Sequence, residues 1–129
     1  MSVGLVLVTH GSSGQSLVEE AAFILGEPLE GVECVPFNHS EGHREEMVQI
    51  HAAIEAAETG DGVLVLTDLI GASPSNRVAV LLEHFDAVMV TGVNLAMLLC
   101  VSANRGMPLG KLTRKAVDCG RRSVKIFQQ

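Results

Sequence analysis

His10 is the first residue whose position suggests chemistry. It follows an apolar run at residues 3–9 and precedes the small, polar stretch Gly-Ser-Ser-Gly. Asp68 ends a second apolar run that begins at residue 62. If both runs are parallel strands of one sheet, their carboxyl ends meet at one edge, where the sites of open α/β proteins lie. A carboxylate there accepts a hydrogen bond from one ring nitrogen of the histidine and leaves the other nitrogen as a nucleophile.

The segments after these two runs are suited to hold an anion. Each leads into an expected helix, whose first backbone N–H groups have no partner within the helix and face the strand ends. Small residues, namely Gly11, Gly14, Gly71 and Ala72, let the backbone approach closely. A nucleophilic imidazole, an orienting carboxylate and an anion cradle are what reversible phosphorylation of His10 requires.

Two other interpretations of the same residues stay open. Asp, Gly and Ser are ordinary turn formers, and a histidine after a strand is often a structural residue. Ser73, His10 and Asp68 also have the side chains of a serine-hydrolase triad. Pro74 follows this serine, however, and has no N–H to donate to an oxyanion, which argues against a hydrolase.

The other histidines indicate no metal centre. His39 and His43 have H-x-x-x-H spacing, but no cysteines adjoin them and the H-E-x-x-H frame is missing. We expect a solvated loop there and no bound metal or other cofactor. His51 and His84 lie within helical patterns, and no G-x-x-x-x-G-K-[ST] sequence for a nucleotide phosphate occurs.

The elements that position these residues follow from short β-branched runs that alternate with segments of helical period. This alternation predicts an α/β fold: a doubly wound, mostly parallel sheet with helices on both faces. Strands are expected over residues 3–9, 32–37, 62–68, 86–92 and 123–127, and helices over 17–26, 45–57, 73–85, 94–106 and 109–120.

Local signals refine two of these helices. Ser16 and Glu19 have capping-box spacing and predict that the first helix starts behind Ser16, and Gly26 predicts its end. Residues 94–106 are apolar nearly all round, which predicts a helix buried on two sides.

Length and charge narrow the class of protein. The 129 residues fit one domain, 1–129. The net charge is −6 and the basic residues occur only singly or in pairs, which argues against a nucleic-acid-binding protein. Without a basic leader or an apolar stretch near 18 residues, we expect a cytoplasmic protein with no membrane insertion. Three scattered cysteines, Cys34, Cys100 and Cys119, predict reduced thiols packed as small hydrophobic groups.

Three motifs together resemble the enzyme IIA component of the mannose-family sugar phosphotransferase system. They are VTHG after the first expected strand, LTDLIGASPSN after the third and VTGVNLAMLL after the fourth, and the resemblance covers nearly the whole chain. It implies that His10 accepts a phosphoryl group from the carrier HPr and passes it to an enzyme IIB protein. It further implies that Asp68 orients His10 and that Ser73 helps to hold the phosphate. Gly11 and Ala72, which let the backbone come close, are expected to bind the phosphate with Ser73.

The resemblance also implies a homodimer that exchanges a C-terminal strand, for which residues 123–127 are the candidate. The family's pattern commonly has an aromatic at Ile70, a glycine at Ala72 and a proline at Ala96. These departures keep the proposed chemistry and alter the surface offered to IIB. No linker or B domain follows, so we expect a separate IIB acceptor. The alternative is a phosphorylation-dependent regulator in an incomplete relay.

Overall fold

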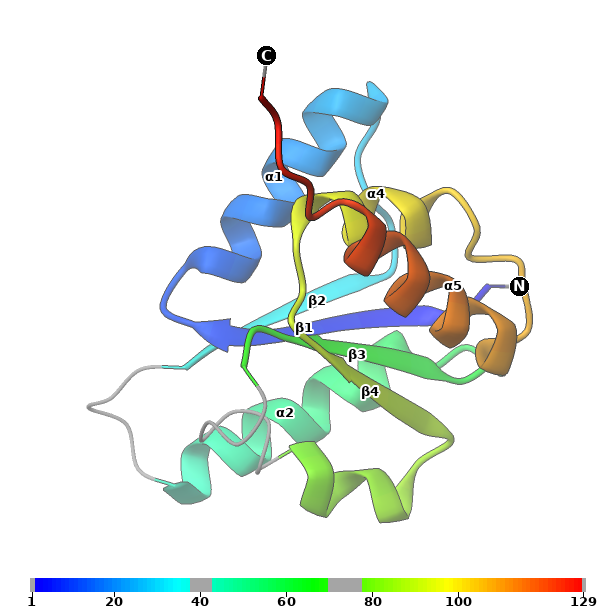
Figure 1. The fold of residues 1–129 in the computed structure, drawn as a ribbon. Coiled ribbons are helices and arrows are strands. Elements are labelled where there is room, and N and C mark those ends of the chain that lie inside the picture. The colour runs from blue at the N-terminus through cyan, green and yellow to red at the C-terminus, as the bar shows by residue number, and fades with distance from the viewer. Residues whose placement is uncertain (1, 38–42, 70–77, 129) are drawn as a thin grey trace.

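A four-stranded parallel sheet is the centre of the molecule (Figure 1). The computed structural model describes residues 2–37, 43–69 and 78–128. The strands stand in the order β2-β1-β3-β4, and each neighbouring pair is parallel. Their bounds are β1 (Gly4–His10), β2 (Val32–Phe37), β3 (Val63–Thr67) and β4 (Ala87–Thr91). The order places the ends of β1 and β3 side by side.

Helices cover both faces of this sheet, which confirms the predicted α/β layering (Figure 1). One face packs against α1 (Ser13–Leu25), α4 (Leu95–Ser102) and α5 (Leu109–Arg122). The other packs against α2 (His43–Ala57) and residues 78–84, which end in the 3₁₀ helix η1 (Leu82–His84).

The two cores follow from the alternation of side chains along a strand. In β1 and β3 the leucines enter the core beneath α1, α4 and α5, and the valines enter the core beneath α2. The residues are Leu5, Leu7, Leu64 and Leu66 on the first side, and Val6, Val8, Val63 and Val65 on the second. Helix α4 packs between α1 and α5, so the predicted burial on two sides is confirmed.

Helix α1 starts earlier than its capping-box pattern predicted. It begins at Ser13 and ends at Gly26, which adopts the left-handed conformation with φ of 76°. The early start follows from a tertiary contact: the backbone N–H of Gly14 donates to the buried hydroxyl of Thr9 at 2.8 Å. A Cβ at position 14 would lie 2.6 Å from that hydroxyl oxygen, so only glycine allows this approach.

The predicted fifth strand pairs with no other strand in the described part of the chain. Residues 124–128 follow α5 without strand hydrogen bonds, and the described sheet has four strands. The side chains of Val124, Ile126 and Phe127 are 79%, 89% and 98% exposed. The alternating pattern that favours a strand therefore stays unpaired among the residues that the structure describes.

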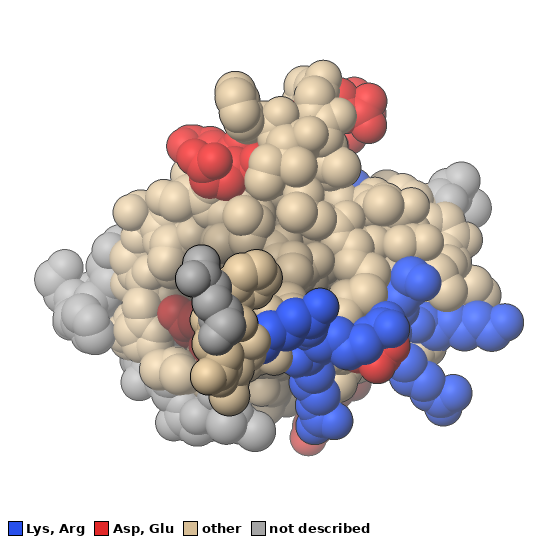
Figure 2. Space-filling view, turned by 45° about the horizontal axis from the view of Figure 1, so that its top comes forward, with Lys and Arg blue, Asp and Glu red and all other residues tan. Residues whose placement is uncertain are grey.

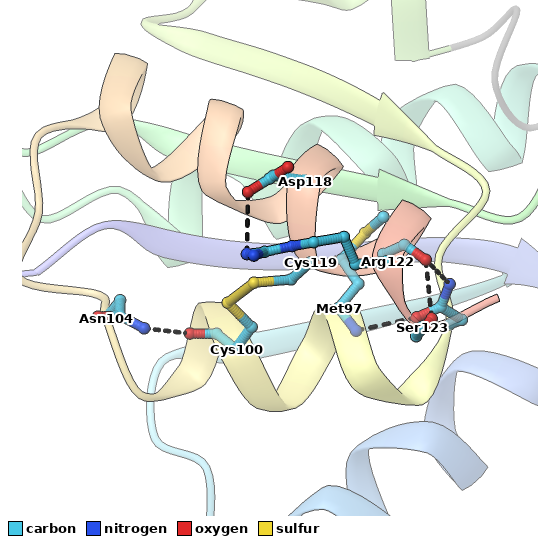
Figure 3. Close-up of a disulfide and its surroundings, with 9 residues drawn as sticks. Met97, Cys100, Asn104, Asp118, Cys119, Arg122 and Ser123 are labelled. Atoms are coloured by element: carbon cyan, nitrogen blue, oxygen red, sulfur yellow. Dashed lines mark hydrogen bonds and ion pairs between the residues drawn. A yellow bond between two sulfur atoms is a disulfide. The ribbon is translucent and has the colours of Figure 1, made fainter. Parts of the chain in front are cut away.

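The cysteine prediction is wrong for two of the three residues. Cys100 of α4 and Cys119 of α5 form a disulfide, with Cα atoms 6.6 Å apart (Figure 3). Their spacing in sequence gives no sign of this, because the pairing depends on how the two helices pack. Cys34 is a free, half-buried thiol. Burial raises its pKa, and the charges of Glu33 and Glu19 raise it further.

Gly4 is expected to be intolerant of any side chain. A Cβ there would lie 2.1 Å from the carbonyl oxygen of Ala57, so Gly4→Ala must push α2 away from β1. We predict a loss of about 3 kcal/mol in the free energy of unfolding, measured by urea denaturation. The matched control is Gly110→Ala in α5, where the new Cβ has open space and stability should rise by up to about 1 kcal/mol. Equal effects at both positions would contradict the contact.

Candidate active site

His10 and Asp68 meet at the carboxyl edge of the sheet. Asp68 Oδ2 accepts the backbone N–H of His10 at 2.9 Å and lies 2.9 Å from its ring Nδ1. Asp68 Oδ1 accepts the backbone N–H of Leu69 at 3.0 Å. Since an ionised carboxylate only accepts, Nδ1 is the protonated nitrogen in this arrangement. The lone pair of the imidazole is then on Nε2.

The imidazole is held on a second side by β2. The parallel register sets His10 beside Phe37, and the two rings meet edge to face with centroids 5.3 Å apart. Ser13 donates its hydroxyl to the carbonyl of His10 at 2.8 Å, which joins the start of α1 to the end of β1. About a third of the His10 side chain, 34%, remains exposed. The ring is therefore oriented and still reachable from outside.

The carboxyl of Asp68 is held in its charged form. Partial burial acts to raise its pKa. The hydrogen bonds from the backbone and ring of His10, together with the electrostatic interaction with that ring, outweigh burial and lower the pKa below its ordinary value. Asp68 is thus an anion at neutral pH that can stabilise positive charge on the imidazole.

The loop residues proposed for phosphate binding are only partly described. Gly11 has φ of 53°, a left-handed turn that favours glycine, and its N–H donates to the carbonyl of Phe37 at 2.9 Å. Gly11 therefore contributes the turn that redirects the chain into α1. Ala72 and Ser73, like Pro74 of the hydrolase alternative, lie outside the described residues.

Sequence reasoning found the central pair and missed its supports. Thr9, Ser13 and Phe37 each hold a part of the site, and none was predicted to do so. Phe37 could have been found by the rule that located Asp68, since it ends the strand on the other side of β1. The bond of Thr9 to α1 and that of Ser13 to His10 have no signal in the local sequence.

The remaining candidate ligands give no second site in the described part of the chain. His39 lies outside it, and His43 is the first residue of α2. Among the described residues, no group of three or more His, Cys, Asp or Glu side chains is placed to hold a metal ion. No described helix has both the length and the apolar character needed to cross a bilayer.

Comparison with known proteins decides the family. A family model described as "PTS system fructose IIA component" matches residues 4–117, where PTS denotes the phosphotransferase system. The chain belongs to this IIA family. It is 32% identical to the mannose-specific EIIAB component of Escherichia coli K12, over 99% of this chain and 40% of that protein. This IIA chain is thus a mannose-family PTS component. It spans about 40% of the length of the curated relatives that it matches.

Solved structures agree on the IIA fold. The mannose/sorbose-specific IIA subunit from Enterococcus faecalis superposes with a TM-score of 0.90 at 22% identity, over 100% of this chain and 97% of that one. Component EIIA from Streptococcus agalactiae superposes with a TM-score of 0.84 at 23% identity, over 96% of each chain. At these identities the likeness supports the fold alone.

The bonds at Asp68 predict a pH-dependent contribution to stability. The pKa of Asp68 is lowered in the folded protein, so its ionised carboxylate stabilises the fold at pH values above the unfolded-state pKa. This stabilisation is lost as the pH falls through the folded-state pKa. We expect Asp68→Asn to cost about 1 kcal/mol at pH 7. The difference in the free energy of unfolding between this variant and the wild type should become smaller below about pH 4. Urea denaturation from pH 7 to 3 measures it, and a gap that stays constant to pH 3 would rule out the assignment.

Proposed function

We propose that this IIA chain carries a phosphoryl group on His10, received from phospho-HPr and passed to an enzyme IIB protein in the cytoplasm. The observation that carries the proposal is the bond between Asp68 Oδ2 and His10 Nδ1. It fixes the tautomer and directs the unprotonated Nε2 as the attacking atom. Family membership supports the proposed reaction class, and the contact with Asp68 supports Nε2 as the proposed reacting atom.

The transfer needs little from the protein beyond position and charge. A bond forms between His10 Nε2 and phosphorus as the bond from phosphorus to the donor group breaks. The imidazole gains positive charge in this step, and the fixed carboxylate of Asp68 lowers the energy of that charge. The reverse sequence returns the lone pair to Nε2 when the acceptor takes the phosphoryl group.

We place the phosphoryl oxygens at the first turn of α1 and the segment after β3. The start of α1 follows His10 by three residues and directs its N-terminal dipole to this edge. Ser73 and Ala72 are proposed to complete the cradle, on the strength of the motif they form in the sequence. Gly11 is proposed to let the chain turn close to the phosphoryl group.

The proposed relay predicts graded losses in two variants. His10→Ala should accept no phosphoryl group from phospho-HPr and should fold normally. Asp68→Asn lacks the charge and can present an N–H₂ group to Nδ1, so its transfer should slow by about 10²- to 10³-fold. Rapid-quench assays with labelled phosphoenolpyruvate, enzyme I and HPr measure both rates. Label that is stable in alkali and labile in acid identifies a phosphohistidine.

Either of two results would refute this assignment. Continued labelling of His10→Ala moves the site to another histidine. An Asp68→Asn rate within about threefold of the wild type, far from the expected electrostatic loss, leaves Asp68 as a turn residue.

We further propose that two copies pair through the C-terminal segment. Three apolar side chains in residues 124–127 are exposed. β4 is the last strand in the described order, so the backbone N–H and C=O groups of its outer edge can pair with an added strand. Residues 123–127 of one copy would add a strand to β4 of the other. This exchange would cover both the apolar side chains and the strand edge.

The pairing predicts a dimer that depends on the tail. Sedimentation at micromolar concentration should give a dimer for the full chain and a monomer for a chain truncated after Ser123. Circular dichroism of the truncated chain should match the full chain, because residues 124–128 are exposed. A monomeric full chain would refute the exchange.

A further inference from the structure

The disulfide joins the last turns of two neighbouring helices. Cys100 lies in the last turn of α4 and Cys119 in the last turn of α5, and Figure 3 shows the bond between them. Ser123 caps the end of α5 and donates its backbone N–H to the carbonyl of Cys119 at 3.2 Å. Residues 124–128 follow directly. The bond therefore fixes the end of the helix from which the C-terminal segment starts.

Other contacts hold the two helices together without the bond. Asn94, the N-cap of α4, donates its side-chain N–H to the carbonyl of Gly120 in α5 at 3.2 Å. A Cβ at position 120 would lie 2.6 Å from Cε of Met97, so the helices approach closely next to Cys119. None of these contacts involves a cysteine sulfur. A reduced chain therefore keeps the two thiols side by side, and the bond can form or break without refolding.

The fold has little need of a permanent disulfide. Small domains depend on disulfides when they cannot bury a sufficient core, whereas this chain buries apolar side chains on both faces of its sheet. In the cytoplasm, disulfides are rare, and those that occur are mostly transient or redox-sensing. A disulfide in a chain that acts in the cytoplasm is therefore expected to respond to the redox state of the cell.

Cys119 lies on the most basic segment of the chain. Six of the nine Lys and Arg residues, and one of the fifteen acidic residues, fall between positions 109 and 128. Figure 2 shows Lys and Arg side chains gathered on one side of the molecule. Lys115 and Arg122 are four residues before and three after Cys119, so they are its neighbours on the helix surface. Asp118 pairs with Arg122 at 2.9 Å, but both side chains are well exposed, so the pair is weak.

These cations favour thiol–disulfide exchange at Cys119. A positive charge beside a cysteine stabilises the thiolate, which is the attacking species. It also attracts a reagent that carries carboxylates. Both cysteines are half-buried, so part of each side chain is open to solvent. The chemistry suits a small disulfide with carboxylate groups, of the class of oxidised glutathione.

We propose that Cys100 and Cys119 form a reversible oxidation site that fixes the end of α5 when the thiol pool of the cell becomes oxidised. This inference rests on the proposed function in the cytoplasm. One protein thiolate attacks a sulfur of the small disulfide, which forms a mixed disulfide and releases one small thiolate. The second protein thiolate then attacks the protein sulfur of the mixed disulfide and releases the other. The pair loses two electrons and two protons, which the reagent takes up as two small thiols.

Oxidation would also strengthen the proposed strand exchange. The exchanged residues 123–127 begin at the end of α5, and the bond restricts the motion of that end. A segment that starts from a fixed point loses less freedom when it pairs with another copy. We expect the dimer dissociation constant to be about three- to tenfold lower for the oxidised chain than for the reduced chain.

Thiol counting in the native protein tests the oxidation site. Cys34→Ser leaves only the two cysteines of the pair. The folded variant is equilibrated with excess reduced or excess oxidised glutathione, alkylated and weighed by mass spectrometry. We expect both thiols to be free in the first case, and an internal disulfide without bound glutathione in the second. A bond that resists excess reduced glutathione until the chain unfolds would be a permanent structural disulfide and would overturn the proposal, as would thiols that stay free in excess oxidised glutathione.

A matched variant ties the redox response to this bond. Cys100→Ser in the Cys34→Ser background cannot form the bond, and circular dichroism should show the same fold. Oxidation should raise the urea midpoint of the two-cysteine protein by about 1 to 2 M and leave that of the matched variant unchanged. Equal midpoints for the oxidised and reduced two-cysteine protein would show that the bond does not fix the end of α5.

Sedimentation and the relay assay separate this proposal from the proposed function. If phospho-HPr fails to label His10, the proposed function falls, and the thiol counts still decide whether the pair is reversible. If neither redox state dimerises, the strand exchange falls, and the urea midpoints still decide whether the bond fixes α5. If both states dimerise with equal dissociation constants, the redox control of pairing is overturned.

Discussion

The candidate site depends on a single carboxylate oxygen that contacts two nitrogen atoms of one residue. Asp68 Oδ2 receives the main-chain N–H of His10 and faces the Nδ1 of the same residue. The first bond fixes where the histidine lies, and the second fixes how its ring is turned. Both require Asp68 to follow the strand directly beside β1, and the sheet order meets this requirement.

The layered architecture supplies that adjacency. β1 and β3 are the inner strands, and each is buried on both faces because leucines and valines alternate between two cores. Strands apolar on both sides are stable only with helices above and below. The register of the parallel pairs then aligns the strand ends, and the polar residues that follow the apolar runs gather at one edge. Hydrophobic burial in the interior therefore sets the geometry of the hydrogen bonds at the surface.

The sequence permitted the prediction of this plan because the plan is periodic. Alternation of strands and helices, and the rule that parallel strands end together, were enough to bring His10 and Asp68 to one site. Features that arise from packing between elements were not predictable in this way. The start of α1 is set by the contact of Gly14 with Thr9, which overrides the capping-box spacing of Ser16. The disulfide and the basic face of α5 likewise appear only when helices are placed side by side.

The all-parallel sheet has a consequence for the order in which the protein folds. Parallel neighbours are joined by crossover connections, so no strand pair in this sheet can form as a local hairpin. His10 and Asp68 are 58 positions apart, and β2 and α2 lie between them in the sequence. Loop closure of this kind slows folding, and its entropic cost precedes any gain from contacts. The contact between His10 and Asp68 therefore depends on long-range folding, and a nascent chain that ends before Asp68 has the imidazole of His10 without its carboxylate partner.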